Sequence, residues 1–413
     1  MLDLKLIRDD PEGVRVALER RKADAPIDEL VELDARRRQL LPELEGLRAE
    51  QNRANQAIAE AKRSGGDASE AIEQMRGVAA RVKEMQAEVA AVDEKLDALR
   101  AGLPNLPAES APAEDEVLRE VGEAGRTGRD HLELLEGMVD MDAGARLSGS
   151  RFAYLRGPVV MLELALVRWA MELTAEHGFE PVIPPVLVRE EALFGTGFLP
   201  DTEQQIYALP QDDLYLAGTS EVALAYIHAG QILDGGDLPR RYAGFSSCFR
   251  REAGAAGKDT RGIFRVHQFD KVEMFSFVEP SESEAEHERL LALQEQILQA
   301  LEIPYRVVNI AAWDLGASAA KKYDLEAWLP GQGRYRELTS TSNTTDYQAR
   351  RLDARYRPDG GAPQHLHTLN GTAVAVGRTI IAIAENHQQD DGSVRVPEAL
   401  QAYGAPPLIR SSP

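Results

Sequence analysis

The sequence predicts an α+β fold in which an amino-terminal helical hairpin precedes a larger domain of strands and helices. Two heptad-patterned segments on either side of a glycine turn predict the hairpin. A strand pair around a glycine-containing loop over residues 245–277, with further strand and helix patterns after it, predicts the second domain. A chain of 413 residues, 43% of them hydrophobic, is long enough for two or more domains with real cores.

The amino-terminal quarter is expected to be helical. Asp10 can cap a short helix that begins at Pro11. Mostly apolar residues then recur in alternating steps of three and four over residues 30–61 and again over residues 75–99, which is typical of a coiled coil.

Two glycines near residue 65 separate these helices, which must therefore fold back on each other. We expect an antiparallel arm over about residues 28–100, roughly 50 Å long at 1.5 Å per residue, within a domain of residues 1–103. Such an arm is commonly a dimerisation or spacing device, and its mixed charges are those of any solvated coiled coil.

A linker is expected over residues 104–115, which are rich in proline, alanine, serine and glutamate. The second domain then covers residues 116–413. Its expected elements are a turn into a strand at 148–155, a helix at 159–176, an extended segment at 177–185, a strand-to-helix junction at 216–221, the strand pair at 245–277, a helix at 282–301, a strand at 305–310, neighbouring strands at 321–328 and 335–340, and a strand leading into an apolar helix at 369–386.

The strand pair carries an unusual polar face. In its second arm Arg265, His267, Phe269, Lys271 and Glu273 alternate and so share one side. Phe269 and Glu273 lie about 13 Å apart at roughly 3.3 Å per residue. This distance is near the span of an adenine joined through a phosphate to an amino acid. Charge pairing across an ordinary hairpin is the alternative explanation.

The same stretch resembles motif 2 of class II aminoacyl-tRNA synthetases, specifically the seryl-tRNA synthetase family. The resemblance rests on Phe249-Arg250-Arg251-Glu252, the loop 253–259, and Val266-His267-Gln268-Phe269-Asp270-Lys271-Val272-Glu273. Residues 177–185 resemble motif 1, residues 369–386 resemble motif 3, and residues 216–221 match the T-x-E loop. The resemblance implies a catalytic domain with a mainly antiparallel sheet flanked by helices, and a homodimer.

The resemblance also implies the site residues. The catalytic residues are Arg250 and Arg378. The serine-binding residues are Thr219, Ser220, Glu221, Glu273 and Thr372. The ATP-binding residues are Arg250, Arg251, Glu252, Arg265, Val266, Phe269, Glu337, Leu338, Thr339, Ser340 and Arg378, of which Glu337 and Ser340 also hold Mg²⁺.

Three of these assignments have simpler structural alternatives. A Glu followed by Thr and Ser, as at residues 337–340, is commonplace without any metal or nucleotide. Thr219 could merely cap the helix that follows it, with Glu221 in the first turn. Arg378 needs a counter-charge at the start of an apolar helix, which either a bound phosphate or an Asp or Glu of the protein supplies.

Composition excludes several other functions. One cysteine, Cys248, allows no disulfide within the chain and no thiolate-rich zinc site, so no structural zinc is expected. No apolar run is long enough to span a membrane, and Met1–Lys5 lacks the order of a signal peptide, so the expected location is cytoplasmic. The net charge of −21 argues against a nucleic-acid partner, but the first 100 residues, with 18 basic against 22 acidic residues, contribute only −4.

The resemblance thus predicts an enzyme that activates L-serine with ATP and transfers it to tRNA(Ser), which the arm contacts, and also to tRNA(Sec). Two alternatives stay open at this point. One is a related ligase that passes its aminoacyl-adenylate to a carrier protein, and the other is a coiled-coil binding protein with an inactive catalytic domain.

Overall fold

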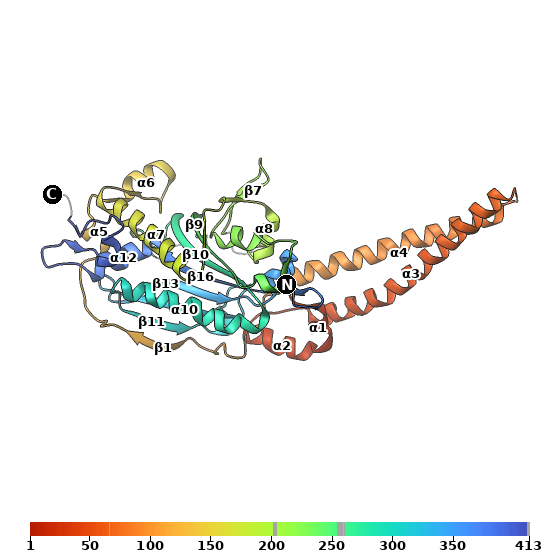
Figure 1. The fold of residues 1–413 in the computed structure, drawn as a ribbon, viewed down its shortest axis with the longest axis horizontal. Helices are drawn as coiled ribbons and strands as arrows, with labels where there is room; N and C mark the ends of the chain where they lie inside the picture. The colour runs from red at the N-terminus through yellow and green to blue at the C-terminus, as the bar shows by residue number, and fades with distance from the viewer. Residues whose placement is uncertain (66, 201–204, 254–258, 260, 411–413) are drawn as a thin grey trace. The chain divides into compact units, whose positions relative to one another are not determined.

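A computed structural model describes residues 1–65, 67–200, 205–253, 259 and 261–410 (Figure 1). The chain divides into two compact units, residues 1–104 and residues 105–413. Among the described residues, no helix has both the length and the apolar character that crossing a bilayer requires.

The first unit consists of helices α1 (Leu4–Asp9), α2 (Pro11–Arg20), α3 (Ile27–Arg63) and α4 (Ser69–Ala101). The Asp10 side chain accepts a hydrogen bond from the backbone N of Gly13, so the predicted cap of α2 is confirmed. Helices α3 and α4 lie side by side as the predicted antiparallel hairpin (Figure 1). Of its glycine turn, Gly65 has a left-handed backbone, and Gly66 lies outside the described residues.

The heptad seam forms the core of this hairpin. Leu40 and Leu44 of α3 pack against Val82 and Val89 of α4. Ion pairs across the two helices flank the seam, among them Arg36 with Glu88, Arg37 with Asp93, and Lys95 with Glu29.

The second unit is built on an eight-stranded sheet in the order β1-β11-β12-β13-β16-β10-β9-β4. Every neighbouring pair is antiparallel except β4 with β9, so the predicted mainly antiparallel sheet is confirmed. The strands are β1 (Glu116–Val121), β4 (Glu180–Val182), β9 (Arg240–Phe249), β10 (Gln268–Val278), β11 (Tyr305–Asn309), β12 (Lys321–Leu329), β13 (Arg334–Asn343) and β16 (His367–Ala375).

The long helices that share one hydrophobic core with this sheet are α7 (Pro158–Glu176), α10 (Ser283–Ala300) and α12 (Val376–Asn386). Their apolar residues pack on Val272 and Met274 of β10 and on Leu325 of β12, all fully buried. These helices were all predicted, because each has an apolar stripe or is apolar throughout.

Smaller elements complete the second unit. They are α5 (His131–Leu134), β2 (Val139–Asp140), α6 (Met141–Ser148), β3 (Tyr154–Leu155), β5 (Leu187–Val188), α8 (Glu190–Thr196), β6 (Tyr207–Leu209), β7 (Leu214–Leu216), α9 (Glu221–Tyr226), β8 (Ile232–Asp234), α11 (Tyr347–Leu352), β14 (Arg355–Arg357), β15 (Gln364–His365), β17 (Val394–Arg395), α13 (Glu398–Gln401) and β18 (Leu408–Ile409), with short 3₁₀ turns at 235–237, 280–282 and 312–314.

The segment that composition predicts to be a linker is packed in the structure. The Asn105 backbone N donates to the Ala317 carbonyl, and its side-chain Nδ2 donates to the carbonyls of Ser318 and Thr344. Ala111 is buried in a small apolar cluster with β11 and the turn that follows it. Backbone and amide hydrogen bonds fix this segment against the second unit, of which it forms the first part.

Candidate active site

The predicted strand pair is the hairpin of β9 and β10, with Phe269 opposite Cys248 and Glu273 opposite Gly244. On its other side β10 pairs with β16, where Glu273 is opposite Thr372. Most of the loop that joins the two arms, residues 254–258, lies outside the described residues. The central position of β10 places motif 2 next to the strand of motif 3.

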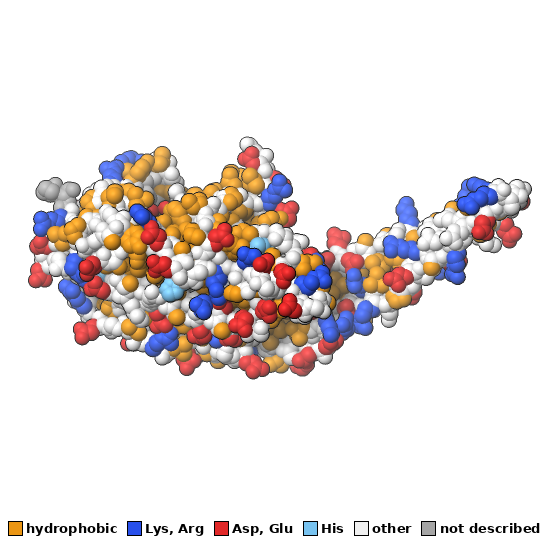
Figure 2. Space-filling model, viewed as in Figure 1, with side chains coloured by type: hydrophobic (Ala, Val, Ile, Leu, Met, Phe, Trp, Pro, Cys, Tyr) orange, Lys and Arg blue, Asp and Glu red, His pale blue; other side chains and the backbone are white. Residues whose placement is uncertain are grey.

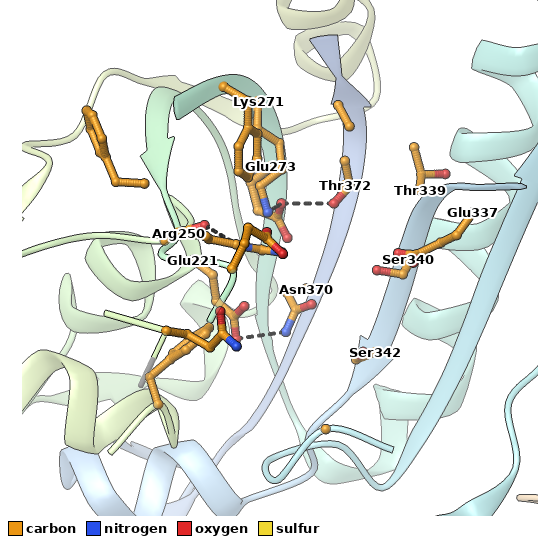
Figure 3. A pocket seen from close by; sticks show the side chains of 18 of the residues that line it. Glu221, Arg250, Lys271, Glu273, Glu337, Thr339, Ser340, Ser342, Asn370 and Thr372 are labelled. Carbon is orange, nitrogen blue, oxygen red and sulfur yellow. Dashed lines mark hydrogen bonds and ion pairs between the residues drawn. The ribbon is translucent and has the colours of Figure 1, made fainter. Parts of the chain in front are cut away.

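A cavity of about 690 Å³ opens over these strands. Figure 3 shows Glu221, Arg250 and Glu273 on one side of this cavity and Glu337 and Ser340 on β13, on the other side of the β16 strand that carries Thr372. The structure brings the following predicted site residues to its lining: Glu221, Arg250, Glu252, Arg265, Val266, Phe269, Glu273, Glu337, Leu338, Thr339, Ser340, Thr372 and Arg378.

Three predicted site residues do not line the cavity. The Ser220 hydroxyl donates to the Gly244 carbonyl at 3.1 Å and braces the T-x-E loop against β9. Arg251 is exposed, and its backbone N donates to the Gln205 carbonyl. The Thr219 hydroxyl accepts from Lys271 Nζ at 2.8 Å and from the Glu221 backbone N at 3.2 Å. Thr219 lies one position before Ser220, the N-cap of α9, whose side chain makes no capping hydrogen bond, so Thr219 is not the helix cap of the simpler alternative.

One end of the cavity is acidic. Glu221 and Glu273 are both buried, and Lys271 Nζ lies 2.5 Å from a Glu273 oxygen. Burial, reinforced by the negative charge of Glu273, raises the pKa of Glu221 to about 7. Thr372 Oγ1 donates to Glu273 Oε2 at 3.2 Å. This end can therefore bind a cation, because only one of two buried carboxylates is neutralised by the protein.

Two amide side chains that the sequence reasoning missed hold Glu221 in place. Its Oε1 accepts from Gln348 Nε2 at 2.8 Å and from Asn370 Nδ2 at 3.0 Å (Figure 3 shows the second contact). Asn370 immediately precedes the glycine of the motif 3 strand, a position from which alternation could have placed it beside Thr372. Gln348 lies in α11 and had no motif around it.

The other end of the cavity is rich in arginine. The Arg250 guanidinium lies 5.4 Å from the centre of the Phe269 ring and donates to the Gly218 carbonyl. Arg265 forms an ion pair with Glu252 at 2.5 Å. Charged, planar donors beside a half-buried aromatic ring suit a ligand that combines phosphate with an aromatic base.

Arg378 has a counter-charge from the protein, which was one of the two alternatives that its sequence position suggested. Its Nη1 donates to the Glu337 carbonyl at 3.0 Å and lies 3.6 Å from the Glu337 carboxylate, so the protein does supply a counter-charge. Burial lowers the pKa of Arg378, as do the positive charges of Arg250, Arg265 and Arg336. A concentration of positive charge that one carboxylate only partly offsets favours an anionic ligand.

A β-bulge in β13 allows Glu337 and Ser340 to face the same cavity. Glu337 and Ser340 are three residues apart, so regular alternation would place them on opposite faces of β13. The register with β12 shifts at Leu338, and both side chains face the cavity (Figure 3). Shielding from water by itself raises the pKa of Glu337, but Arg378, Lys322, Arg250 and Arg265 outweigh this effect and lower it.

A divalent cation fits this pair as far as donor chemistry goes, since carboxylate and hydroxyl oxygens are hard ligands. Within the described part of the chain, no group of three or more His, Cys, Asp or Glu side chains could by itself hold a metal ion. A cation at Glu337 and Ser340 would therefore take its other ligands from water or from a bound phosphate.

The motif 2 and motif 3 strands lie side by side in a mainly antiparallel sheet. The cavity over them has a carboxylate end and an arginine end. Together these features define a class II aminoacyl-tRNA synthetase core. A family model described as the tRNA synthetase class II core domain (G, H, P, S and T) matches residues 207–387. A second model, the seryl-tRNA synthetase N-terminal domain, matches residues 1–107.

Relatives match over nearly the whole chain. The serine–tRNA ligase of Thermobifida fusca is 50% identical over 98% of this chain and 97% of its own, and that of Micrococcus luteus is 51% identical over 98% of both. A crystal structure of seryl-tRNA synthetase from Pyrococcus horikoshii complexed with ATP is 43% identical, with a TM-score of 0.92 and full coverage of both chains. The chain belongs to the seryl-tRNA synthetase family, and it is a ligase of the aminoacyl-tRNA synthetase class.

Proposed function

We propose that this enzyme activates L-serine with ATP to form seryl-adenylate and pyrophosphate, and then transfers serine to the 3′ end of tRNA(Ser). The observation that carries this proposal is the single cavity with two buried carboxylates at one end and a set of arginines at the other. The serine carboxylate is itself the nucleophile, so the protein has to align it with the α-phosphate and offset the charge that develops.

The arginine end is assigned to ATP. Arg250 lies between Phe269 and the T-x-E loop, where it can hold the α-phosphate and the serine carboxylate together while the base stacks on Phe269. Arg265 and Arg378 take the outer phosphates. Glu252, now paired with Arg265, turns to the adenine when phosphate replaces it as the partner of that arginine.

Magnesium, when bound with ATP at Glu337 and Ser340, supplies positive charge beside the phosphates. Lys322 lines the same wall of the cavity, and its Nζ pairs with Asp324 at 2.9 Å.

The carboxylate end is assigned to serine. The substrate ammonium supplies the missing counter-charge for Glu221, and Glu273 with Thr372 meets the substrate hydroxyl. A pocket that is built to pair with a hydroxyl rejects alanine, because its own polar groups would then be left unpaired.

The Thr372→Val substitution is expected to raise the KM for serine about tenfold and to leave the KM for ATP nearly unchanged. Valine has nearly the same size as threonine but lacks the hydroxyl beside Glu273. The substitution therefore weakens the binding of the substrate hydroxyl without changing the shape of the pocket. Steady-state ATP–pyrophosphate exchange measures both constants. An equal rise in both would remove Thr372 from the serine pocket.

The arm of α3 and α4 is assigned to tRNA. We infer that it contacts the tRNA by shape and backbone charge, which requires few sequence-specific side chains. A tRNA(Sec) with a similar long variable arm is a second substrate in this proposal, which charging of a tRNA(Sec) transcript tests. With tRNA as substrate, the cytoplasm is the proposed location.

A homodimer forms part of the proposal, through the face that includes motif 1. Met161 and Leu164 of α7 are about half exposed, and Ile183, just after β4, is 81% exposed. Figure 2 shows hydrophobic side chains gathered over the part of the catalytic unit where Figure 1 places α7. Exposed apolar residues in such number mark an interaction surface.

The Ile183→Asp substitution is expected to convert the dimer into monomers at micromolar concentration. In a twofold interface the new carboxylate appears twice and has no partner. Val117→Asp is the matched control, since Val117 is 45% exposed on β1 at the opposite edge of the sheet. Sedimentation velocity distinguishes the cases, and a wild-type monomer would exclude the homodimer.

Serine-dependent ATP–pyrophosphate exchange, beside glycine, alanine, threonine and cysteine, tests the proposed reaction. Exchange with serine alone, followed by charging of tRNA(Ser), is the expected result. Exchange without charging would instead point to a ligase for a carrier protein. No exchange with any amino acid would point to a binding protein.

A further inference from the structure

A buried histidine and glutamate that have no place in the proposed chemistry join four segments, one of which leads into the ATP end of the cavity. His131 is the first residue of α5, and Glu385 lies in the last turn of α12. His131 is 4% exposed, and Glu385 is completely buried. Burial of a carboxylate is costly unless hydrogen bonds or a charged partner compensate for the lost water.

Both oxygens of Glu385 are engaged. Oε1 accepts from the His131 backbone N at 3.2 Å and lies 3.2 Å from the ring Nδ1. Oε2 accepts from the backbone N of Gly331, in the turn between β12 and β13, at 2.9 Å. A carboxylate is an acceptor only, so the ring must carry its proton on Nδ1.

This tautomer leaves Nε2 of His131 with a free lone pair, and the backbone N of Ile263 donates to it at 3.4 Å. The two residues before Ile263 are also fixed. Gly262 has φ of +74°, and a Cβ there would lie 2.1 Å from His131 Nε2, so the backbone runs directly against the ring. Arg261 pairs with Asp130 at 2.8 Å. Residues 130–131 therefore hold residues 261–263 in one place.

Residues 261–263 lead directly into the wall of the cavity. Phe264 follows, and the guanidinium carbons of Arg336 and Arg378 lie 3.8 Å and 4.7 Å from the centre of its ring. Arg378 Nε also faces the Phe264 carbonyl at 3.4 Å. Arg265 comes next along the chain. A shift of Ile263 would therefore move the ring and carbonyl against which Arg378 rests, together with Arg265.

We propose that His131 is a positioning residue for ATP, acting through the backbone of Ile263 on Phe264, Arg265 and Arg378, with Glu385 fixing its tautomer. The proposal rests on the assignment of the arginine end of the cavity to ATP. Glu385 also lies two turns after Arg378 on α12, so the same pair ties the motif 3 helix to the carboxyl-terminal end of the motif 2 loop.

Two substitutions of His131 separate its two hydrogen bonds. In His131→Asn the shorter side chain keeps a donor for Glu385 but does not reach Ile263. In His131→Gln the longer side chain brings an acceptor to the Ile263 backbone N. We expect His131→Asn to weaken ATP binding about fivefold to tenfold, the effect of one hydrogen bond, and His131→Gln to restore it to within about twofold.

The measurements are equilibrium dialysis of ATP, the separate KM values for ATP and serine in pyrophosphate exchange, and hydrogen exchange of the Ile263 amide. The expected result is faster Ile263 exchange and weaker ATP binding in His131→Asn, with an unchanged serine KM, and reversal of both in His131→Gln. Equal changes for both substrates, or unchanged ATP binding, would overturn the proposal.

A second variant covers the case in which His131→Asn does not fold. Arg261→Gln removes only the ion pair with Asp130, because the Arg261 side chain is 67% exposed and can be changed without disturbing the core. A selective weakening of ATP binding by about twofold supports the proposal, and no change overturns it. If the wild-type enzyme lacks serine-dependent exchange, the proposed function fails, whereas ATP dialysis still decides the role of His131.

Discussion

Replacement of Arg378 by alanine is expected to slow serine-dependent ATP–pyrophosphate exchange by about 10²- to 10³-fold, the cost typical of losing one preorganised charge at a developing anion. The guanidinium is held in advance by the Phe264 ring and the Glu337 carbonyl, so little of its interaction with phosphate is spent on ordering the side chain. Exchange assays at saturating serine measure the effect.

The matched control for this substitution is Arg378→Lys. Lysine keeps the charge that balances Glu337 but lacks the planar fork, so we expect it to recover only part of the rate. Thermal unfolding separates lost activity from lost structure, because alanine also leaves Glu337 with less positive charge nearby. Near-normal exchange in a folded Arg378→Ala enzyme would contradict the assigned role.

Shortening the arm is expected to reduce tRNA charging by at least about 100-fold in kcat/KM while leaving pyrophosphate exchange within about twofold of normal. Replacement of residues 48–81 by a short glycine-serine turn removes the distal half of the hairpin. The seam of Leu40, Leu44, Val82 and Val89 stays in place. Loss of several phosphate contacts with the arm's basic residues accounts for the size of the effect.

A charge variant of the full-length arm serves as the comparison. Arg48, Arg53, Lys62 and Arg76 are changed to glutamine, which keeps the helices but removes their positive charge. A loss comparable to that of the shortened arm would show that charge dominates, and it would flatten the salt dependence of charging. Full charging by the shortened enzyme would mean that the arm is not the tRNA contact.

Periodic patterns in the sequence predicted the helical hairpin and the polar face of β10. The heptads predicted the two helices of the hairpin, and the glycine turn between them predicted that they run antiparallel. Alternation placed Phe269, Lys271 and Glu273 on the cavity side of β10. Order along the chain could not reveal which strands are neighbours. Pairing of β1 with β11, nearly 200 residues apart, depends on tertiary packing alone.

The sequence did not reveal the residues that hold other site residues in place through hydrogen bonds. Gln348 and Asn370 hold Glu221, and His131 holds Ile263, through contacts between positions more than 120 residues apart. The bulge at Leu338 is equally hidden, because the sequence pattern does not mark a one-residue slip in a strand. The motifs mark the groups proposed to touch the substrates, whereas their supports depend on the fold.

The single cysteine makes this enzyme convenient for fluorescence work. Cys248 has no exposed surface in β9, and burial raises the pKa of its thiol, so maleimide dyes should leave it unmodified. A cysteine introduced at the exposed tip of the arm, as in Ser64→Cys, would then carry the only label without any cysteine first being removed. Energy transfer from that dye to an acceptor on the tRNA would report arm engagement turnover by turnover.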